Sequence, residues 1–286
     1  SRLIERFTKR INLIARDSKD KLTKEVDNIF VDPQLKNLKL TGKGFRKEFD
    51  ELENATLAGT EINIGQAQNN KMFNKIFPEE LYNRFKSTKD KTFSLSELNK
   101  IRTELNNFAS KNLNPGKDVG DQKLFQSIRT LQESIEDTMF NQIHKALPKK
   151  QADIYVDLIN AQKFGIELAN QQSIKNLMQT QPEGVTGYLL ALQPAGASGN
   201  TRVKGFMEFL KATNSYDEIN IIRNDLVDYV KRNYLDETMG DPITLARGYQ
   251  KFLKEKLPTL KLIFPEEQFN KIVATRKSFN EKIIKP

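Results

Sequence analysis

Apolar side chains recur at spacings of three or four residues along several long stretches of this chain. One such stripe runs from Leu95 to Phe108, and another runs from Leu124 to Ile143. This spacing places side chains on one face of an α-helix, whereas a half-buried strand would need strict alternation. No stretch alternates convincingly, so we predict an all-α protein with isolated extended residues at most.

A five-residue phrase, Ile-Phe-Pro-Glu-Glu, occurs twice, at 76–80 and at 263–267. Proline suits the first helical position, and two acids in the first turn face the positive end of the helix dipole. The phrase therefore predicts a helix–break–helix unit that is used twice. With the apolar stripes, it predicts an elongated multi-helix bundle of about a dozen amphipathic helices.

Local signals place several helix boundaries. Ser94 and Glu97 fit a capping box, and Asp241 followed by Pro242 fits an N-cap and a first helical residue. Helices are further expected at 69–76, 78–87, 202–212, 217–235 and 242–256, with a short Pro-started helix at 181–183 and a loop at 41–44.

The predicted domain organisation rests on one low-complexity stretch, residues 193–201, which reads Gln-Pro-Ala-Gly-Ala-Ser-Gly-Asn-Thr. Such a composition is typical of a hinge or linker. We therefore expect an N-terminal part at 1–60 with a long basic helix, a central helical bundle at 61–192, this linker, and a C-terminal helical subdomain at 202–286.

The net charge of +9 is concentrated at the two ends of the chain. Residues 1–47 carry 13 Lys/Arg against 6 Asp/Glu, and residues 251–286 carry 9 against 4. Basic ends predict an anionic partner, which is nucleic acid, a lipid surface or an acidic protein; a solvated lysine-rich surface is the alternative. The candidate anion-binding residues are Arg6, Lys9, Arg10 and Arg16 on the first helix, and Arg202 after the glycine-rich stretch.

The first helix, predicted over residues 2–31, has a narrow apolar edge with a change of phase after Ser18. An edge of this kind packs against a partner helix, either in the same chain or in a neighbouring subunit. We call it the assembly seam, and it consists of Ile4, Phe7, Ile11, Ile14, Leu22, Val26 and Ile29.

The residue types that catalysis and metal binding need are scarce. The chain has no cysteine, which excludes disulfides and thiolate metal sites, and His144 is its only histidine. The adjacent acids of the repeated phrase are explained by helix starts, whereas glycoside cleavage needs carboxylates on both sides of a cleft. We therefore expect no enzyme activity, no cofactor, no metal and no small-molecule substrate.

Membrane and targeting signals are not evident in the sequence. No run of about 18 apolar residues occurs, which argues against an ordinary membrane span. Charges occur throughout the first 30 residues, so no signal peptide is predicted. The chain begins at Ser1 and stops at Pro286, directly beside helical patterns, which fits a piece of a longer polypeptide and equally a trimmed chain.

The stretch from Leu95 to Phe108, the Gly/Pro loop after it and the stripe from Leu124 to Ile135 resemble helical portions of bacteriophage internal virion proteins. These are also called ejection or cargo proteins, and the resemblance extends loosely over 90–280. It implies a protein that is packed inside a capsid or tail and expelled with the genome, and that helps DNA to cross the cell envelope. The peptidoglycan-cleaving domain that some of these proteins carry has no counterpart in this sequence.

The expected function is a non-enzymatic structural and assembly module that acts through helix–helix contacts and basic ends. Its expected partners are other virion subunits or copies of itself, and also DNA or an anionic membrane surface. Its expected location is the virion interior, or the cytoplasm if the protein is not of phage origin. Two alternatives stay open: a nucleic-acid-binding helical protein, and an effector that binds a host partner through an exposed apolar patch.

Overall fold

The computed structural model describes residues 2–54, 92–113, 119–170, 198–236 and 240–284, together with Asn83 and Thr238. Helices hold 86% of the described residues, so the predicted all-α class is confirmed. The described residues form nine α-helices. Apart from Asn83, which is helical, the helices expected at 69–76, 78–87 and 181–183 lie outside them, so the count of about a dozen stays a prediction.

The chain divides into two compact units. Unit 1 combines residues 1–10 with 177–286, and unit 2 comprises residues 11–176. Helix α1 (Arg2–Ile29) confirms the predicted long first helix. The division between the two units falls inside this helix. Part of the predicted linker, residues 198–201, forms the start of helix α11 (Ser198–Ala212), and its remainder lies outside the described residues. The predicted boundary near residue 60 also lies outside them.

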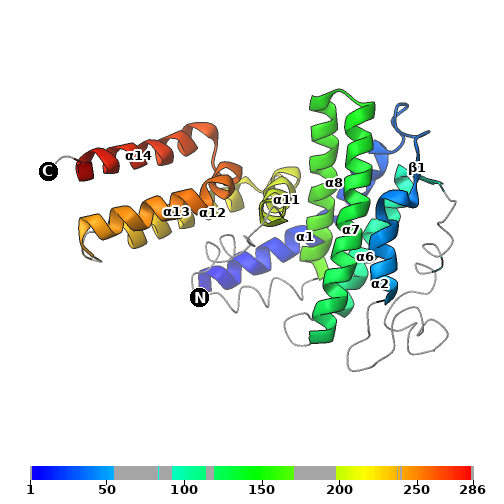
Figure 1. The fold of residues 1–286 in the computed structure, drawn as a ribbon, viewed down its shortest axis with the longest axis horizontal. Helices are drawn as coiled ribbons and strands as arrows, with labels where there is room; N and C mark the ends of the chain where they lie inside the picture. Colours follow the sequence, from blue (N-terminus) through cyan, green and yellow to red (C-terminus); the bar gives the residue numbers. More distant parts are fainter. Residues whose placement is uncertain are drawn as a thin grey trace. The chain divides into compact units, whose positions relative to one another are not determined.

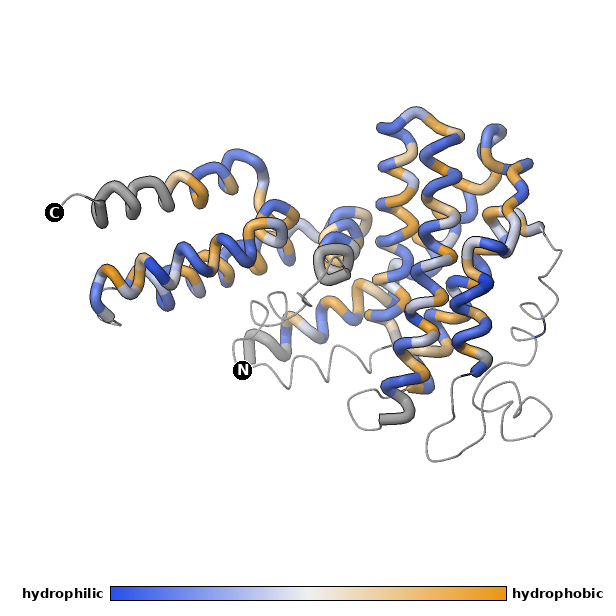
Figure 2. Tube along the Cα trace, viewed as in Figure 1, coloured by the Kyte–Doolittle hydropathy of each residue, from blue (hydrophilic) through white to orange (hydrophobic). Residues whose placement is uncertain are grey.

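Unit 2 is built around three helices that each pack against the other two: α6 (Leu95–Asn112), α7 (Val119–Ala146) and α8 (Lys149–Asn170) (Figure 1). Helix α2 (Arg46–Asn54) packs against α7. Figure 2 shows hydrophobic positions recurring along each of these helices. Both predicted stripes are buried throughout, and their members are Leu95, Leu98, Ile101, Leu105 and Phe108 in α6, and Leu124, Ile128, Leu131, Ile135, Met139 and Ile143 in α7.

The start of α6 has the capping box that the sequence predicts. The Ser94 hydroxyl accepts a hydrogen bond from the Glu97 amide at 3.1 Å, and the Glu97 carboxylate accepts one from the Ser94 amide at 2.7 Å. Two otherwise unpaired helix donors are thereby satisfied, which fixes where the helix begins.

Two short strands hold the connection before α2. Strand β1 (Lys39–Thr41) pairs antiparallel with β2 (Thr92–Ser94), with buried Leu40 opposite buried Phe93. A 3-10 turn (Gly42–Phe45) follows β1, so the loop predicted at 41–44 is wrong. The turn approaches α7 closely: a Cβ at Gly44 would lie 2.7 Å from Thr138 Oγ1, and Ser134 Oγ donates to the Gly44 carbonyl at 2.8 Å.

Unit 1 contains α11, α12 (Tyr216–Val230), α13 (Pro242–Ile263) and α14 (Glu266–Ile284). The Asp241 cap is confirmed, because its carboxylate accepts from the amides of Ile243 and Thr244, both at 3.0 Å. Helices α13 and α14 form an antiparallel hairpin that breaks at the second copy of the repeated phrase (Figure 1). The first copy lies outside the described residues, so its repetition stays a prediction.

Two predicted helix ends in unit 1 are wrong. Helix α13 continues past residue 256 and through Pro258, because Thr259, Leu260 and Ile263 are buried beyond it while Pro258 itself is exposed. Helix α12 ends at Val230 and gives way to a π-helical turn, η3 (Lys231–Leu235), where one continuous helix was expected. No helix among the described residues combines the length and apolarity that a membrane span requires.

Candidate functional site

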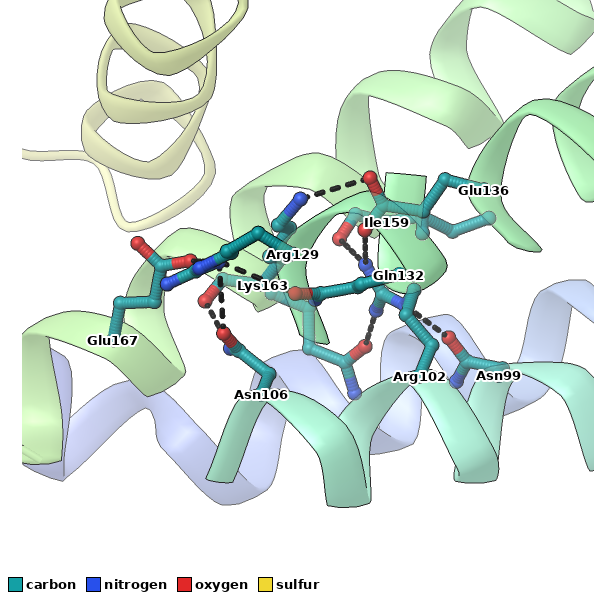
Figure 3. A network of polar contacts seen from close by, with 10 residues as sticks. Asn99, Arg102, Asn106, Arg129, Gln132, Glu136, Ile159, Lys163 and Glu167 are labelled. Atoms are coloured by element: carbon teal, nitrogen blue, oxygen red, sulfur yellow. Dashed lines mark hydrogen bonds and ion pairs between the residues drawn. The ribbon is translucent and has the colours of Figure 1, made fainter. Parts of the chain in front are cut away.

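Polar side chains from α6, α7 and α8 converge in the middle of unit 2, where a helical bundle ordinarily has apolar ones. Figure 3 shows them pointing toward one another from the three helices. We call this group the charged core, and it consists of Asn99, Arg102 and Asn106 from α6, Arg129, Gln132 and Glu136 from α7, and Gln162, Lys163 and Glu167 from α8.

Arg102 is the centre of the charged core and is only 1% exposed. Its Nε donates to Asn99 Oδ1 at 3.1 Å, and its two terminal nitrogens reach the other helices: Gln162 Oε1 at 2.8 Å, the Ile159 carbonyl at 3.3 Å and Glu136 Oε1 at 3.4 Å. Burial lowers the pKa of the guanidinium, and the negative charge of Glu136 opposes that shift. The planar fork of arginine suits this divergent set of acceptors.

Glu136 is shared by two cations. Its second oxygen accepts from Lys163 Nζ at 2.8 Å, so one carboxylate of α7 joins α6 to α8. The neighbouring Asp137 is affected by the same group: partial burial raises its pKa, the charge of Glu136 adds to the rise, and Lys163 opposes it. Both oxygens of Glu136 are therefore paired with cations of neighbouring helices.

Arg129 makes the second interhelical connection. It pairs with Glu167 of α8, and it also donates to Asn106 Oδ1 at 3.3 Å and to Gln132 Oε1 at 3.2 Å. The Asn106 amide in turn donates to the Lys163 carbonyl at 3.1 Å. The two connections thus tie all three helices together at successive levels.

The charged core holds three cations and two carboxylates, and every one of these charges has an ionic partner in a neighbouring helix. Two donors, Arg129 Nε and the Gln132 amide, have no acceptor among the described residues. Charges that are paired between three helices fix how those helices are aligned, because any shift along the axis separates several partners at once. Its chemical role is therefore alignment of α6, α7 and α8.

Metal-ligating chemistry is not found among the described residues, where no group of three or more His, Cys, Asp or Glu is placed to hold a metal ion. His144 lies in the last turn of α7 and is 40% exposed, with its Nε2 at 3.8 Å from an Asp153 carboxylate oxygen. An open depression between α2 and α7 is lined by charges that include two pairs one helical turn apart, Arg46 with Asp50 and Lys47 with Glu51.

The sequence reasoning missed the charged core, although the spacing carries a signal. The α6 members lie at positions i, i+3 and i+7, and the α7 members repeat the same spacing. This is a polar stripe beside the apolar one, on a face that turns toward neighbouring helices. A polar stripe on one helix is ordinarily interpreted as a water-facing surface, and only the matching stripe on the next helix distinguishes the two cases.

The predicted anion-binding residues have different surroundings. Arg6, Lys9 and Arg16 are exposed on α1. Arg10 instead forms an ion pair with Glu218, whose side chain is 2% exposed, and also lies 3.9 Å from Asp217. Arg202 belongs to α11, and its side chain lies outside the described residues.

The assembly seam is largely covered within the chain. Phe7, Ile11, Leu22, Val26 and Ile29 are buried and Ile14 is half-buried, whereas the side chain of Ile4 lies outside the described residues. A partner helix from another subunit would therefore have to replace existing contacts or use other surfaces. The large apolar side chains that remain exposed in the described residues lie on separate elements, and they are Leu13, Val31, Ile154, Tyr216 and Ile243.

The sequence matches no protein-family model and no curated protein, and the fold matches no solved structure.

Proposed function

We propose that this protein is a non-enzymatic structural module, which assembles with copies of itself or with partner chains through its helical surfaces. The supporting observation is that the buried charges of unit 2 are paired with one another. Side chains that an enzyme would aim into a cleft are engaged with one another between α6, α7 and α8, and they align the helices. A bundle with a fixed helix alignment presents an equally fixed outer surface to a partner.

The resemblance of 95–135 to internal virion proteins of bacteriophages supplies a setting for this role. In that setting the module would be packed in a capsid or tail, and other virion subunits would be its partners. The polar outer faces of its long helices are compatible with many copies stacked at high concentration.

Light scattering coupled to size-exclusion chromatography tests assembly. We expect a mass above 32.9 kDa that increases with protein concentration. A matched pair of variants locates the surface: Leu13→Glu places a charge on a side chain that is 59% exposed in α1, and Ile154→Glu does so on one that is 56% exposed in α8. Dissociation by one variant and not by the other assigns the contact, whereas a compact monomer at every concentration contradicts the proposal.

Nucleic-acid binding is the second candidate function. It is favoured by the exposed cations Arg6, Lys9 and Arg16 along α1. It predicts an affinity that falls steeply with added salt, and weaker binding when these three residues are replaced by glutamine. An affinity that does not change with salt would remove this candidate.

A further inference from the structure

Helix α13 carries a row of cations on its water-facing side. Its 22 residues include five Lys/Arg, and Glu255 is its single acid. With about 100° of rotation and about 1.5 Å of rise per residue, four exposed cations fall within an arc of about 80° and extend over about 21 Å of helix. We call them the α13 basic stripe, and they are Arg247, Lys251, Lys254 and Lys261.

The charge of the stripe is not neutralised by the described residues. None of its four cations forms an ion pair with another described residue. On the neighbouring helix α14, by contrast, the exposed Lys271 is paired with Glu267 at 2.7 Å. The position between Lys254 and Lys261 on this face is occupied by the exposed Pro258, and the single acid, Glu255, lies at the edge of the row, about 40° around the helix from Lys251. Such a row attracts anions over a distance of about a Debye length, roughly 10 Å at moderate salt.

The apolar face of α13, opposite the stripe, indicates whether the anionic partner is a lipid membrane. The apolar residues on that face, among them Leu245, Leu253 and Leu260, are buried inside unit 1, where α13 packs against α11, α12 and α14. Figure 2 shows hydrophilic and hydrophobic positions recurring in turn along the helix. A helix that enters a lipid surface needs its apolar face free to insert beside the cations. That face is already used in α13, which disfavours a membrane as the partner.

The aromatic residues of α13 indicate whether a nucleic acid bound by the stripe is single-stranded or double-stranded. Tyr249 and Phe252 are buried, and their rings stack on each other at 6.4 Å between centroids. Binding of single strands relies on exposed aromatic rings on which bases stack, and the stripe offers none. A straight row of cations without rings suits the phosphate backbone of a duplex.

We propose that the α13 basic stripe binds the phosphate backbone of duplex DNA, without reading its base sequence. This surface is separate from the assembly surfaces proposed above and from the α1 cations, so each of these proposals can fail alone. The stripe would hold DNA through charge only, in the way that non-specific binders do.

Fluorescence anisotropy with a labelled duplex DNA of arbitrary sequence tests the proposal on the full chain. The variant Arg247→Gln/Lys251→Gln/Lys254→Gln removes three charges from the stripe. The control Lys145→Gln/Lys149→Gln/Lys150→Gln removes three exposed charges from α7 and α8 in unit 2. We expect the stripe variant to bind at least about tenfold more weakly near 0.1 M salt, and the slope of log K against log salt to become less steep by about 2.7. The control variant keeps both values.

Three results would overturn the proposal: no duplex binding by the unchanged chain, equal losses in both triple variants, or equally tight binding of polyglutamate or anionic vesicles. Arg247→Lys keeps the charge and is expected to retain the affinity, which separates loss of charge from loss of structure. Light scattering of the same variants reports on assembly independently, so failure of DNA binding is distinguishable from failure of the proposed assembly.

Discussion

The two units are both helical, but they place their charges in opposite ways. In α6 of unit 2, Arg102 lies only about 40° around the helix from the buried Leu98, so its charge is carried into the bundle. In α13 of unit 1, the basic stripe lies roughly opposite the buried Tyr249 and Leu253, so its charge is carried to water. The angle between a charge and the apolar face therefore decides whether that charge aligns helices or forms a surface.

The largest effect is expected for Arg102→Leu. Removing the guanidinium leaves Glu136 and the Gln162 oxygen without their buried donor, so unit 2 should lose about 3–5 kcal/mol of unfolding free energy. Hydrogen exchange of α6–α8 peptides should be measured together with urea unfolding, so that the loss is assigned to unit 2. The control Arg16→Leu, at an exposed position of α1, should change stability by less than about 0.5 kcal/mol. Similar losses of unfolding free energy in Arg102→Leu and Arg16→Leu would contradict the difference between charges that align helices and charges that face water.

Leu253→Ala examines the apolar interior of unit 1 in the same way. Leu253 is 0% exposed, and its truncation should destabilise unit 1 by about 2–5 kcal/mol through lost burial and a remaining cavity. Hydrogen exchange of α11–α13 peptides should report the loss, with little change in α6–α8. An equal loss of protection in α6–α8 would mean that the units do not unfold independently.

Ser94→Ala removes the hydroxyl of the α6 capping box and should cost about 1 kcal/mol. Ser94→Gly should cost less, because glycine is itself an acceptable N-cap residue. Urea unfolding of the two variants side by side measures the difference. Equal stability of the alanine variant and the unchanged chain would contradict a role of the cap in fixing the start of α6.

Asp137→Asn should raise the stability of unit 2 slightly at neutral pH. The pKa of Asp137 is raised in the folded state, mainly by burial, so the folded state binds this proton more tightly than the unfolded chain. Stability contributed by Asp137 is therefore present at low pH and declines as the pH rises from the unfolded pKa through the folded one. Melting temperatures across the acidic range should show this decline in the unchanged chain and a weaker decline in the variant.

The smallest effect is expected for the triple glutamine variant of the α13 basic stripe. Its three positions are exposed, so the free energy of unfolding should change by less than about 0.5 kcal/mol for each substitution. Urea unfolding in low salt checks this. A loss of more than about 3 kcal/mol of unfolding free energy in the triple variant would show that these charges stabilise unit 1. The stripe would then not differ from the charged core in this respect.

Much of the fold could be predicted because its signals are local. The apolar stripes of α6 and α7 and the caps at Ser94 and Asp241 depend on spacings of a few residues. The β1–β2 pair could not be predicted, because each strand has three residues and its partner lies far along the chain. Continuation of α13 through Pro258 likewise depends on the burial of residues beyond it, which spacing does not reveal.

The candidate sites were predicted less well than the fold. The exposed α1 cations follow from charge counting, but Arg10 is paired with Glu218, a residue more than two hundred positions away. Arg102 was missed because its burial depends on Glu136 and Gln162 of two other helices. The basic end at 251–286 was recognised by its composition, whereas the row on α13 needs the exposed fraction of each side chain.

The division inside α1 has a consequence for synthesis on the ribosome. Residues 11–176 emerge as one uninterrupted stretch, whereas unit 1 needs residues 1–10 and 177–286 together. Because domains generally fold as they emerge, unit 2 should become native first. Residues 1–10 would then remain unpacked, joined to the folded unit 2, until residues 177–286 are translated. A slowly translated stretch near residue 177 would lengthen that interval without altering the finished protein.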